Sequence, residues 1–497
     1  MTWMLNTRRA LRAGAPLLAI LAVACDPAPD AGNGMELAAA TPSATTEAKV
    51  AAPQTAQADD GLNDQQRMDA YYAPDRVIAL TLTMDSDQWA EIRDEVPLEQ
   101  NNTSCFIGER YTWFEAPELE IAISNADGTP VANYSYSDIG IKKKSFLGSR
   151  SEIKPSFNID LAKYDDDNEP LAESQIGTKR LTWNNALQDD SLLKQCFGYH
   201  LFRLAGLPAS RCNFSSLAVY HPDTSTSEWI GIYVNVEPIR KKYMKNPANN
   251  FDASDEGTLY EIATHDIDLT GMTYNDYKGY ADDYARQDYG LAVEAMDQDT
   301  NGTRGIASTI NLDQFNRYWA MEAIIQHRDG YARNITNTYI YNDNDLKNAD
   351  ELSTANTAFE FLPSGIDQIF DKTDCWQLFR CARIPRRLYA AGQVDGVNAN
   401  ISELLNTFGE DKSQITAYIE QLRVTANATW TGNDVLFGPN NGKVDSYAAY
   451  LDEWFNAALA KAEDSIAGGA NQSCWNNCFN GSGRACPGNI VTPPTTP

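Results

Sequence analysis

The spacing of apolar residues changes along this chain from a strand-like period to a helix-like period. In the first half, short runs such as Val77–Thr83 alternate β-branched and apolar residues, the pattern of a half-buried strand. Beyond Asn311 the apolar residues recur at intervals of three and four, the spacing of one buried helix face. The sequence therefore predicts an α+β fold with a strand-rich first half and a helical second half.

Further segments of the first half have strand or helix character. Strands are expected over 118–124, 140–144, 154–160, 217–220 and 229–236, and the last two are expected to pair. Helices are expected over 86–95 and 190–204. No internal repeat is visible. The chain is long enough for one large domain or two lobes.

The N-terminus has the composition of a targeting segment. Three arginines precede the apolar run Leu17–Ala24, which is too short to span a bilayer. The run ends in Leu-Ala-Val-Ala followed by Cys25, which resembles the lipobox of bacterial lipoproteins. We expect a signal peptide over 1–24 and a lipid on Cys25, with the protein anchored at the cell envelope or outside the cell. The alternative is an ordinary signal peptide with a chance cysteine.

Both ends of the mature chain differ in composition from its middle. Residues 25–66 are rich in Ala, Thr, Pro and Gly and nearly lack aromatic residues, which favours a flexible tether. Residues 67–470 form the expected domain, and 471–497 form a cysteine-rich tail. Eight cysteines remain besides Cys25, an even number that favours disulfides in an exported chain. A zinc site in the tail is the weaker alternative because three clustered thiols lack a fourth ligand.

The formal net charge is −28 and the isoelectric point is near 4.5. A chain that binds nucleic acid needs a basic surface for the phosphate backbone, so this charge argues against that class of partner. The charge is compatible with a cationic protein partner, or it serves solubility alone.

One motif in the second half carries specific chemistry. Residues His327–Asn334 read His-Arg-Asp-Gly-Tyr-Ala-Arg-Asn and fit the kinase catalytic-loop pattern H-R-D-x-x-x-x-N. A helix that begins with the capping-box-like Asn311–Gln314 runs directly into this loop. Two strands, 338–341 and 359–362, follow it, and a second acid, Asp367, comes next. Kinases use this order of elements to build a metal and phosphate site.

The residue types suit phosphoryl transfer. Magnesium is a hard cation that prefers carboxylate and amide oxygens, which Asp367 and Asn334 supply. Asp329 can accept the proton of a substrate hydroxyl or orient that hydroxyl. On the loop alone, an equal alternative is that Asp329 is a surface acid at the end of a helix.

Two other motifs lack part of their patterns. The segment 438–443 resembles a phosphate loop but has the wrong spacing and no Ser or Thr after its lysine. The segment 297–302 begins like a calcium loop, yet Ser308 stands where the twelfth-position Glu belongs. A structural turn is the favoured interpretation there, with weak calcium binding as the alternative.

Over residues 70–465 the sequence resembles the CotH kinase family, named after spore-coat protein H. The matching segments are Ile139–Lys144, Lys154–Phe157, Leu181–Asp189, Tyr199–Pro208, Gly231–Glu237, Leu259–Glu261, His327–Tyr341 and Phe361–Phe370. The resemblance implies an atypical, two-lobed protein-kinase-like fold that uses ATP with Mg²⁺ or Mn²⁺. It also implies activity on serine residues of surface proteins, so a basic, Ser-rich protein is the expected substrate.

The resemblance implies a role for each motif residue. Asp329 would be the catalytic-loop acid, Asn334 a metal ligand, and Asp367 the counterpart of the metal-binding aspartate of kinases. Asp367 departs from the family pattern because it stands in Gly-Ile-Asp instead of Trp-Asp-x-Asp.

The phosphate-binding lysine is left open between Lys144 and Lys154. Glu237 would orient that lysine or contact the nucleotide. Ser145 follows Lys144 where common family members have Gly. Two functions remain open: an active extracytoplasmic kinase of Ser or Thr residues, and a catalytically weak surface lipoprotein that acts as a binding module.

Overall fold

The structure is a computed structural model, and all the residues it describes belong to one compact unit. It describes residues 61–96, 111–144, 149–189, 191–252, 255–262, 265–280, 284–300, 302–371 and 376–467. The expected signal peptide, Cys25 and the cysteine-rich tail lie outside these residues. Helix α1 (Asp64–Tyr71) begins within the last residues of the expected tether. None of the helices described is long and apolar enough to cross a membrane.

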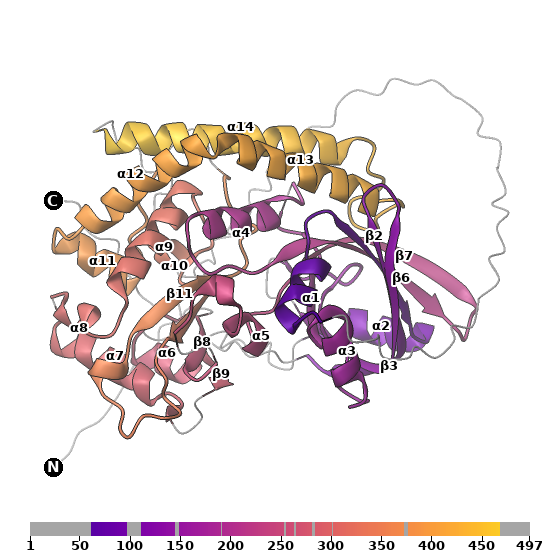
Figure 1. The fold of residues 1–497 in the computed structure, drawn as a ribbon, viewed down its shortest axis with the longest axis horizontal. Coiled ribbons are helices and arrows are strands. Elements are labelled where there is room, and N and C mark those ends of the chain that lie inside the picture. The colour runs from indigo at the N-terminus through magenta and orange to yellow at the C-terminus, as the bar shows by residue number, and fades with distance from the viewer. Residues whose placement is uncertain are drawn as a thin grey trace, which may run out of the picture. The chain divides into compact units, whose positions relative to one another are not determined.

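Seven strands of the first half form a closed barrel in the order β1-β2-β3-β4-β5-β7-β6 (Figure 1). They are β1 (Arg76–Thr83), β2 (Trp113–Asn125), β3 (Pro130–Lys144), β4 (Ser156–Asp160), β5 (Arg180–Asn184), β6 (Cys212–His221) and β7 (Thr226–Val236). The barrel closes through the parallel pair β1–β6, whereas its other neighbours are antiparallel. The expected strands are confirmed, including the pairing of β6 with β7.

The barrel has its own apolar core. In β1, the alternate side chains Ile78, Leu80 and Leu82 are buried, as the two-residue period predicts. Helix α2 (Ser86–Asp94) adds Trp89, whose ring centroid lies 5.7 Å from that of Phe157 in β4. Helix α3 (Asn168–Ile176) and α1 pack outside the strands.

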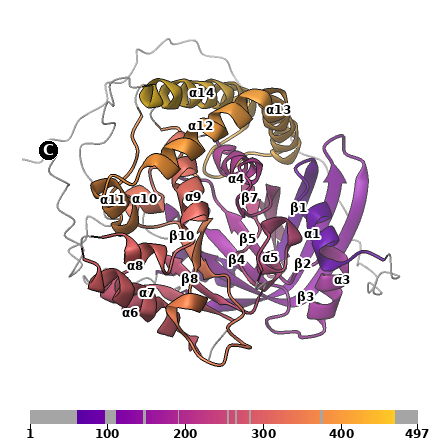
Figure 2. The same cartoon turned by 60° about the vertical axis from the view of Figure 1, so that its left-hand side comes forward.

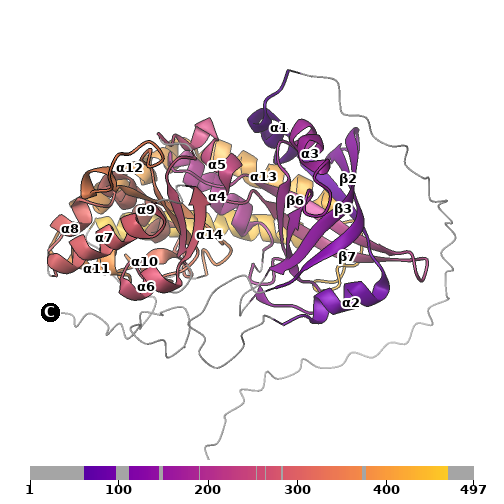
Figure 3. The same ribbon diagram turned by 90° about the horizontal axis from the view of Figure 1, so that it is seen from below.

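A second sheet and most of the helices form the remainder of the unit, which lies beside the barrel (Figure 3). The sheet has the order β11-β10-β8-β9, with β8 (Thr258–Ile262), β9 (Asp276–Tyr280), β10 (Thr338–Asn342) and β11 (Phe359–Pro363). The helices are α4 (Lys194–Leu204), α5 (Lys241–Met244), α6 (Leu269–Tyr274), α7 (Gln287–Gln298), α8 (Arg304–Ala307), α9 (Leu312–Ile324), α10 (Tyr331–Asn334), α11 (Arg383–Ala390), α12 (Asp395–Glu410), α13 (Lys412–Thr429) and α14 (Lys443–Ile466). The predicted α+β class is therefore confirmed.

Helix α9 leads into the candidate catalytic loop and shows why its position is fixed. Its N-cap Asn311 accepts a hydrogen bond from the backbone N–H of Gln314, in the expected capping position. Phe315 and Trp319 are fully buried, and the ring centroid of Phe315 lies 4.8 Å from that of Phe361 in β11. The helix therefore packs on the second sheet, and the chain continues from its C-terminal end to His327.

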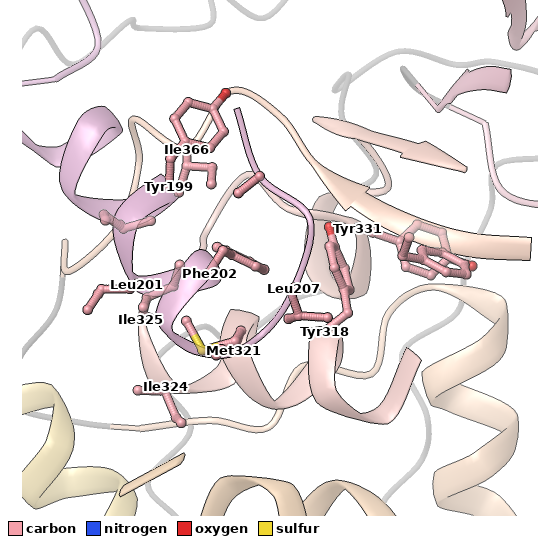
Figure 4. Packing of buried hydrophobic residues seen from close by; sticks show 14 of the residues in the cluster. Tyr199, Leu201, Phe202, Leu207, Tyr318, Met321, Ile324, Ile325, Tyr331 and Ile366 are labelled. Atoms are coloured by element: carbon pink, nitrogen blue, oxygen red, sulfur yellow. The ribbon is translucent and has the colours of Figure 1, made fainter. Parts of the chain in front are cut away.

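Helix α4 connects the barrel to the helical part. It contacts β6, β7 and α13 (Figure 2), and the Cys196–Cys212 disulfide ties it to β6. Its other face packs on α9, as Figure 4 shows for Phe202 and Met321. This disulfide accounts for two of the cysteines expected to be oxidised, and Cys381 is disulfide-bonded as well.

The calcium-like segment is a turn built from its own side chains. Asp299 accepts hydrogen bonds from the backbone N–H groups of Arg304 and Gly305. Asp297 pairs with Arg383. Since both carboxylates are engaged by protein groups, the structure favours the turn interpretation over the calcium loop.

Candidate active site

Asp329 lies in the connection between α9 and α10, and three side-chain amides hold its carboxylate. Asn337 donates to Oδ2 at 2.9 Å, and Gln368 donates to the same oxygen at 3.3 Å. Asn334, the expected metal ligand, donates to Oδ1 in a short contact. Asn337 also donates to the backbone carbonyl of Asp329 at 3.0 Å. Sequence reasoning identified Asn334 but missed Asn337 and Gln368.

Asp367 lies on a turn that packs against the Asp329 loop. The backbone N–H of Ser364 donates to the carbonyl of Asn337 at 3.0 Å. Gly365 has a φ of +53°, and a Cβ there would lie 2.5 Å from the side-chain oxygen of Asn337. Only glycine meets both conditions without strain. On the other side, Ile366 packs against α4 near Tyr199 (Figure 4).

Asp329 lies close enough to Asp367 for its negative charge to act on the Asp367 carboxyl group. Burial raises the pKa of Asp367 to about 7, and the negative charges of Asp329 and Asp189 add to that rise. Burial also raises the pKa of Asp329, while the hydrogen bond from Asn334 opposes the rise. Both side chains are nevertheless only half-buried, so solvent and small ligands can reach them. Crowded carboxylates of this kind favour a bound cation, which would keep them ionised.

Asp189 is a third acid of this site that sequence reasoning missed. It is 2% exposed and stands between β5 and α4, inside a segment of the family resemblance. Its Oδ1 accepts hydrogen bonds from the hydroxyl and backbone N–H of Ser191. The negative charge of Asp189 raises the pKa of Asp367, so Asp189 contributes to the electrostatics of the site.

Glu322 anchors the loop from within α9. It is fully buried, and it accepts the backbone N–H groups of Tyr331 and Ala332 at 2.8 Å each. The fully buried His327 ring lies 3.6 Å from the Glu322 carboxylate, so the motif histidine is part of the packing and does not face a substrate. A Cβ on Gly330 would lie 2.2 Å from Glu322 Oε1, which leaves room only for glycine. The sequence signal that could have revealed Glu322 is the presence of an acidic residue on the apolar face of α9.

Left-handed backbone conformations cluster around the two acids. Gln326, Ile335, Asn337 and Phe370 have φ values of 50°, 56°, 49° and 57°. For a β-branched residue such as Ile335 this conformation is costly. Strained residues persist where surrounding packing dictates them, and they gather at functional sites. Their position on both sides of Asp329 and beside Asp367 supports a functional role for these two loops.

Lys154, one of the two candidates for the phosphate-binding lysine, is paired with Asp434. Its side chain is fully buried, and Nζ donates to Asp434 Oδ2 at 2.6 Å. The ammonium lies 5.1 Å from the ring centroid of Tyr233 and 4.4 Å from that of Phe437. Burial lowers the pKa of Lys154 to about 8, although Asp434 opposes this shift. The ammonium of Lys154 is thus surrounded by a carboxylate and two aromatic rings.

Glu237 is also paired with a residue that was not expected. Its Oε1 accepts from the Arg211 guanidinium at 2.8 Å, and its Oε2 accepts the backbone N–H of Arg211 at 3.0 Å. It is 1% exposed, and burial raises its pKa against the pull of Arg211. The carboxylate therefore stabilises Arg211 and orients neither of the two candidate lysines.

Lys144 ends β3 and is connected to α4 by side-chain hydrogen bonds. Its Nζ donates to the side chain of Asn184 at 3.1 Å, and Asn184 donates to Gln195 of α4 at 3.0 Å. The chain of contacts thus reaches the helix that packs on the Asp367 turn. Ser145, the departure from the family pattern, lies outside the described residues.

The residues of the site can be compared with the ligands that a divalent cation prefers. Within the described part of the chain, no group of three or more His, Cys, Asp or Glu side chains is arranged to bind a metal. Asp367 and the amide oxygen of Asn334 fit a hard cation by their chemistry. Phosphate oxygens and water would complete the coordination, as is usual for magnesium.

Comparison with models of known protein families finds a related family. The model of the CotH kinase protein family matches residues 144–371, a span that contains Asp329, Asn334 and Asp367. No curated protein sequence matches the chain.

Proposed function

We propose that this chain, whose residues 144–371 belong to the CotH kinase family, is an extracytoplasmic atypical protein kinase. It would transfer the γ-phosphate of ATP to a Ser or Thr hydroxyl of a surface or secreted protein. One observation carries the proposal: Asp329 and Asp367, 38 positions apart, lie on loops that are hydrogen-bonded to each other, and both acids are partly exposed there.

The two acids would have different tasks. Asp367, with the amide oxygen of Asn334, would hold Mg²⁺ or Mn²⁺, which neutralises the charge that develops on the phosphates. Asn334 uses its amide nitrogen on Asp329, so its oxygen remains the atom suited to a cation. Asp329 would orient the substrate hydroxyl and accept its proton. The hydrogen bonds from Asn334 and Asn337 to its carboxylate favour the ionised form that this task requires.

The kinase-like, two-lobed arrangement is part of the same proposal. The strand-rich lobe would be the barrel, and the helix-rich lobe would carry both acids. Helix α4 joins them through its disulfide to β6 and its packing under the Asp367 turn. The nucleotide would then bind where α4, the Asp329 loop and the Asp367 turn meet.

Location and partner follow from chemistry outside the site. A buried disulfide suits an oxidising compartment, which supports an extracytoplasmic protein held by a lipid on Cys25. The net charge of −28 favours a basic, Ser-rich protein substrate and disfavours nucleic acid.

A second function is a catalytically weak binding module. The observation that favours it is Lys154, whose fully buried ammonium is paired with Asp434. To separate the two functions, the chain from residue 26 onward is incubated with labelled ATP, a Ser- and Lys-rich polypeptide, and Mg²⁺ or Mn²⁺. Phosphate transfer supports the kinase. If calorimetry detects no nucleotide binding with either metal, the kinase proposal is wrong and the binding module replaces it.

A further inference from the structure

We infer that Lys194 and Arg328 form an anion site for the phosphate groups of the nucleotide, and that Asp371 fills this site when no ligand is bound. The inference rests on the proposed function, because it names the cations that would complement the two acids. It assigns the phosphate-binding lysine to Lys194, a residue that the motif analysis did not consider.

Asp371 bridges two cations that come from different segments. Its Oδ1 lies 3.2 Å from Lys194 Nζ in α4, and its Oδ2 lies 3.2 Å from an Arg328 guanidinium nitrogen. One anion thus uses each of its oxygens for a separate cation. A phosphate group offers the same kind of oxygens and a larger charge, so it can compete for both cations.

The bridge is directly connected to the two acids. Arg328 precedes Asp329, and its backbone N–H donates to the carbonyl of Gln368, the residue after Asp367, at 3.0 Å. Gln368 in turn donates to the Asp329 carboxylate. A metal held by Asp367 and phosphates held by Arg328 would therefore lie on neighbouring parts of the same loops.

Burial and charge suit an anion site. The Lys194 side chain is 2% exposed and the Arg328 side chain is 38% exposed, so one cation is deep and the other is accessible. Arg333, which is 7% exposed, donates to the carbonyl of Arg328 at 2.7 Å and adds a third positive charge. The carboxylates of Asp371 and Asp329 both act on this group of cations, and Asp371 is the one whose place a phosphate group would take.

Lys194 is also better placed than the lysine in the barrel. The partner of Lys154, Asp434, is fully buried, whereas Asp371 is 21% exposed and can be displaced from Lys194, whose ammonium also lies 4.8 Å from the ring centroid of Trp454. Four residues after Lys194, a Cβ on Gly198 would lie 2.7 Å from Ile366, so α4 carries Lys194 on the same helix that supports the Asp367 turn.

The competing interpretation is a structural clamp in which Asp371 only fastens α4 to the loops. The two interpretations predict opposite effects of Asp371→Asn. If Asp371 only fastens α4 to the loops, its replacement weakens ligand binding. If Asp371 occupies an anion site, its replacement frees Lys194 and Arg328 and strengthens the binding of another anion. A misfolded variant cannot bind more tightly, so the direction of change is informative.

The test measures binding of inorganic tripolyphosphate and of Mg-ATP by calorimetry to the chain from residue 26 onward. We expect Asp371→Asn to bind tripolyphosphate roughly tenfold more tightly, and Lys194→Gln to bind both ligands roughly tenfold more weakly. Lys278→Gln is the matched control: its side chain is 8% exposed and also bridges two carboxylates, those of Glu261 and Asp276. This control should bind like the wild type.

The outcomes separate this inference from the proposed function. If the wild type binds Mg-ATP and the Lys194 and Asp371 variants bind like the Lys278 control, the anion site is wrong and the kinase proposal stands. Weaker binding by Asp371→Asn would establish the clamp instead. If the wild type binds tripolyphosphate through Lys194 but no ATP, the anion site holds and the nucleotide is excluded. If it binds neither, both proposals are wrong.

Discussion

Asn337 donates hydrogen bonds to both the side-chain carboxylate and the backbone carbonyl of Asp329, at 2.9 and 3.0 Å. One amide thus fixes the direction of the acid and the conformation of the loop that carries it. Asn337 also stands in a left-handed conformation, with a φ of 49°, beside the Asp367 turn. The first prediction follows from this pair.

Replacing Asn337 by glycine keeps the left-handed backbone and removes the amide. We expect Asn337→Gly to lower kcat on the order of tenfold, because the carboxylate loses a donor that orients it and favours its ionised form. The acidic limb of the pH–rate profile should move to higher pH, and nucleotide affinity should change little. A profile that keeps its position would show that Asn337 acts on folding alone.

The two acids should differ in what they affect. Asp329→Asn should lower kcat by about 10²-fold or more and leave nucleotide affinity nearly intact, since Asp329 acts on the incoming hydroxyl. Asp367→Asn should weaken metal-dependent nucleotide binding as well as turnover. Calorimetric titration beside the phosphorylation assay measures both, with Asp313→Asn in the first turn of α9 as a control. Equal losses of affinity in both variants would contradict the separate roles.

Stability should depend on pH and metal through Asp367. Its pKa rises from 3.8 to about 7 on folding, so its contribution to stability is complete below about pH 4 and is lost as pH rises through about 7. A cation bound to the carboxylate offsets this loss. We therefore expect Mg²⁺ to raise the unfolding temperature more at pH 8 than at pH 5, and Asp367→Asn to abolish the difference. An equal effect of Mg²⁺ at both pH values would contradict a metal at Asp367.

The pair Lys154–Asp434 should matter for stability and not for nucleotide binding. Asp434→Asn leaves a buried ammonium without a counter-charge and should cost about 3–5 kcal/mol in free energy of unfolding. Lys154→Met should be destabilising, and its folded fraction should bind Mg-ATP like the wild type. Denaturant unfolding and calorimetry measure the two effects. A selective loss of ATP affinity in Lys154→Met would restore Lys154 as the phosphate-binding lysine.

The lipid anchor predicts a change in location. Cys25→Ser removes the thiol that would carry the lipid, so the protein should move from the membrane fraction to the detergent-free supernatant. Fractionation of cells that express each form measures this. An unchanged distribution would show that the lipobox interpretation is wrong.

Local patterns predicted most of the elements and both acids. The two-residue period of β1 and the three-to-four-residue period of α9 are properties of neighbouring residues, so the sequence displays them directly. The same holds for the order of helix, acidic loop, two strands and second acid. Asp329 and Asp367 could be identified because the sequence also shows the helix and strands that surround them in a kinase.

Partners could not be predicted where they are distant in sequence. Lys154 pairs with Asp434, 280 positions away, and Glu237 pairs with Arg211 across neighbouring strands. Asn334 and Asn337 are both asparagines near Asp329, and spacing alone favoured the one that fits a known pattern. Asn337 has a left-handed backbone, and its side-chain amide donates to the Oδ2 and to the backbone carbonyl oxygen of Asp329.

The buried contact at Asp434 imposes an order on how this chain can fold. Its Oδ2 accepts the backbone N–H of Ile232 in β7, and a Cβ on Gly231 would lie 1.9 Å from the same oxygen. The barrel strands end at Val236, yet the buried Lys154 lacks its counter-ion until residue 434 arrives. A polypeptide that emerges N-terminus first, from a ribosome or through a membrane pore, must therefore wait with an unfinished barrel for nearly two hundred further residues. Completion of this domain should be a late, all-or-none event that a C-terminally truncated chain cannot reach.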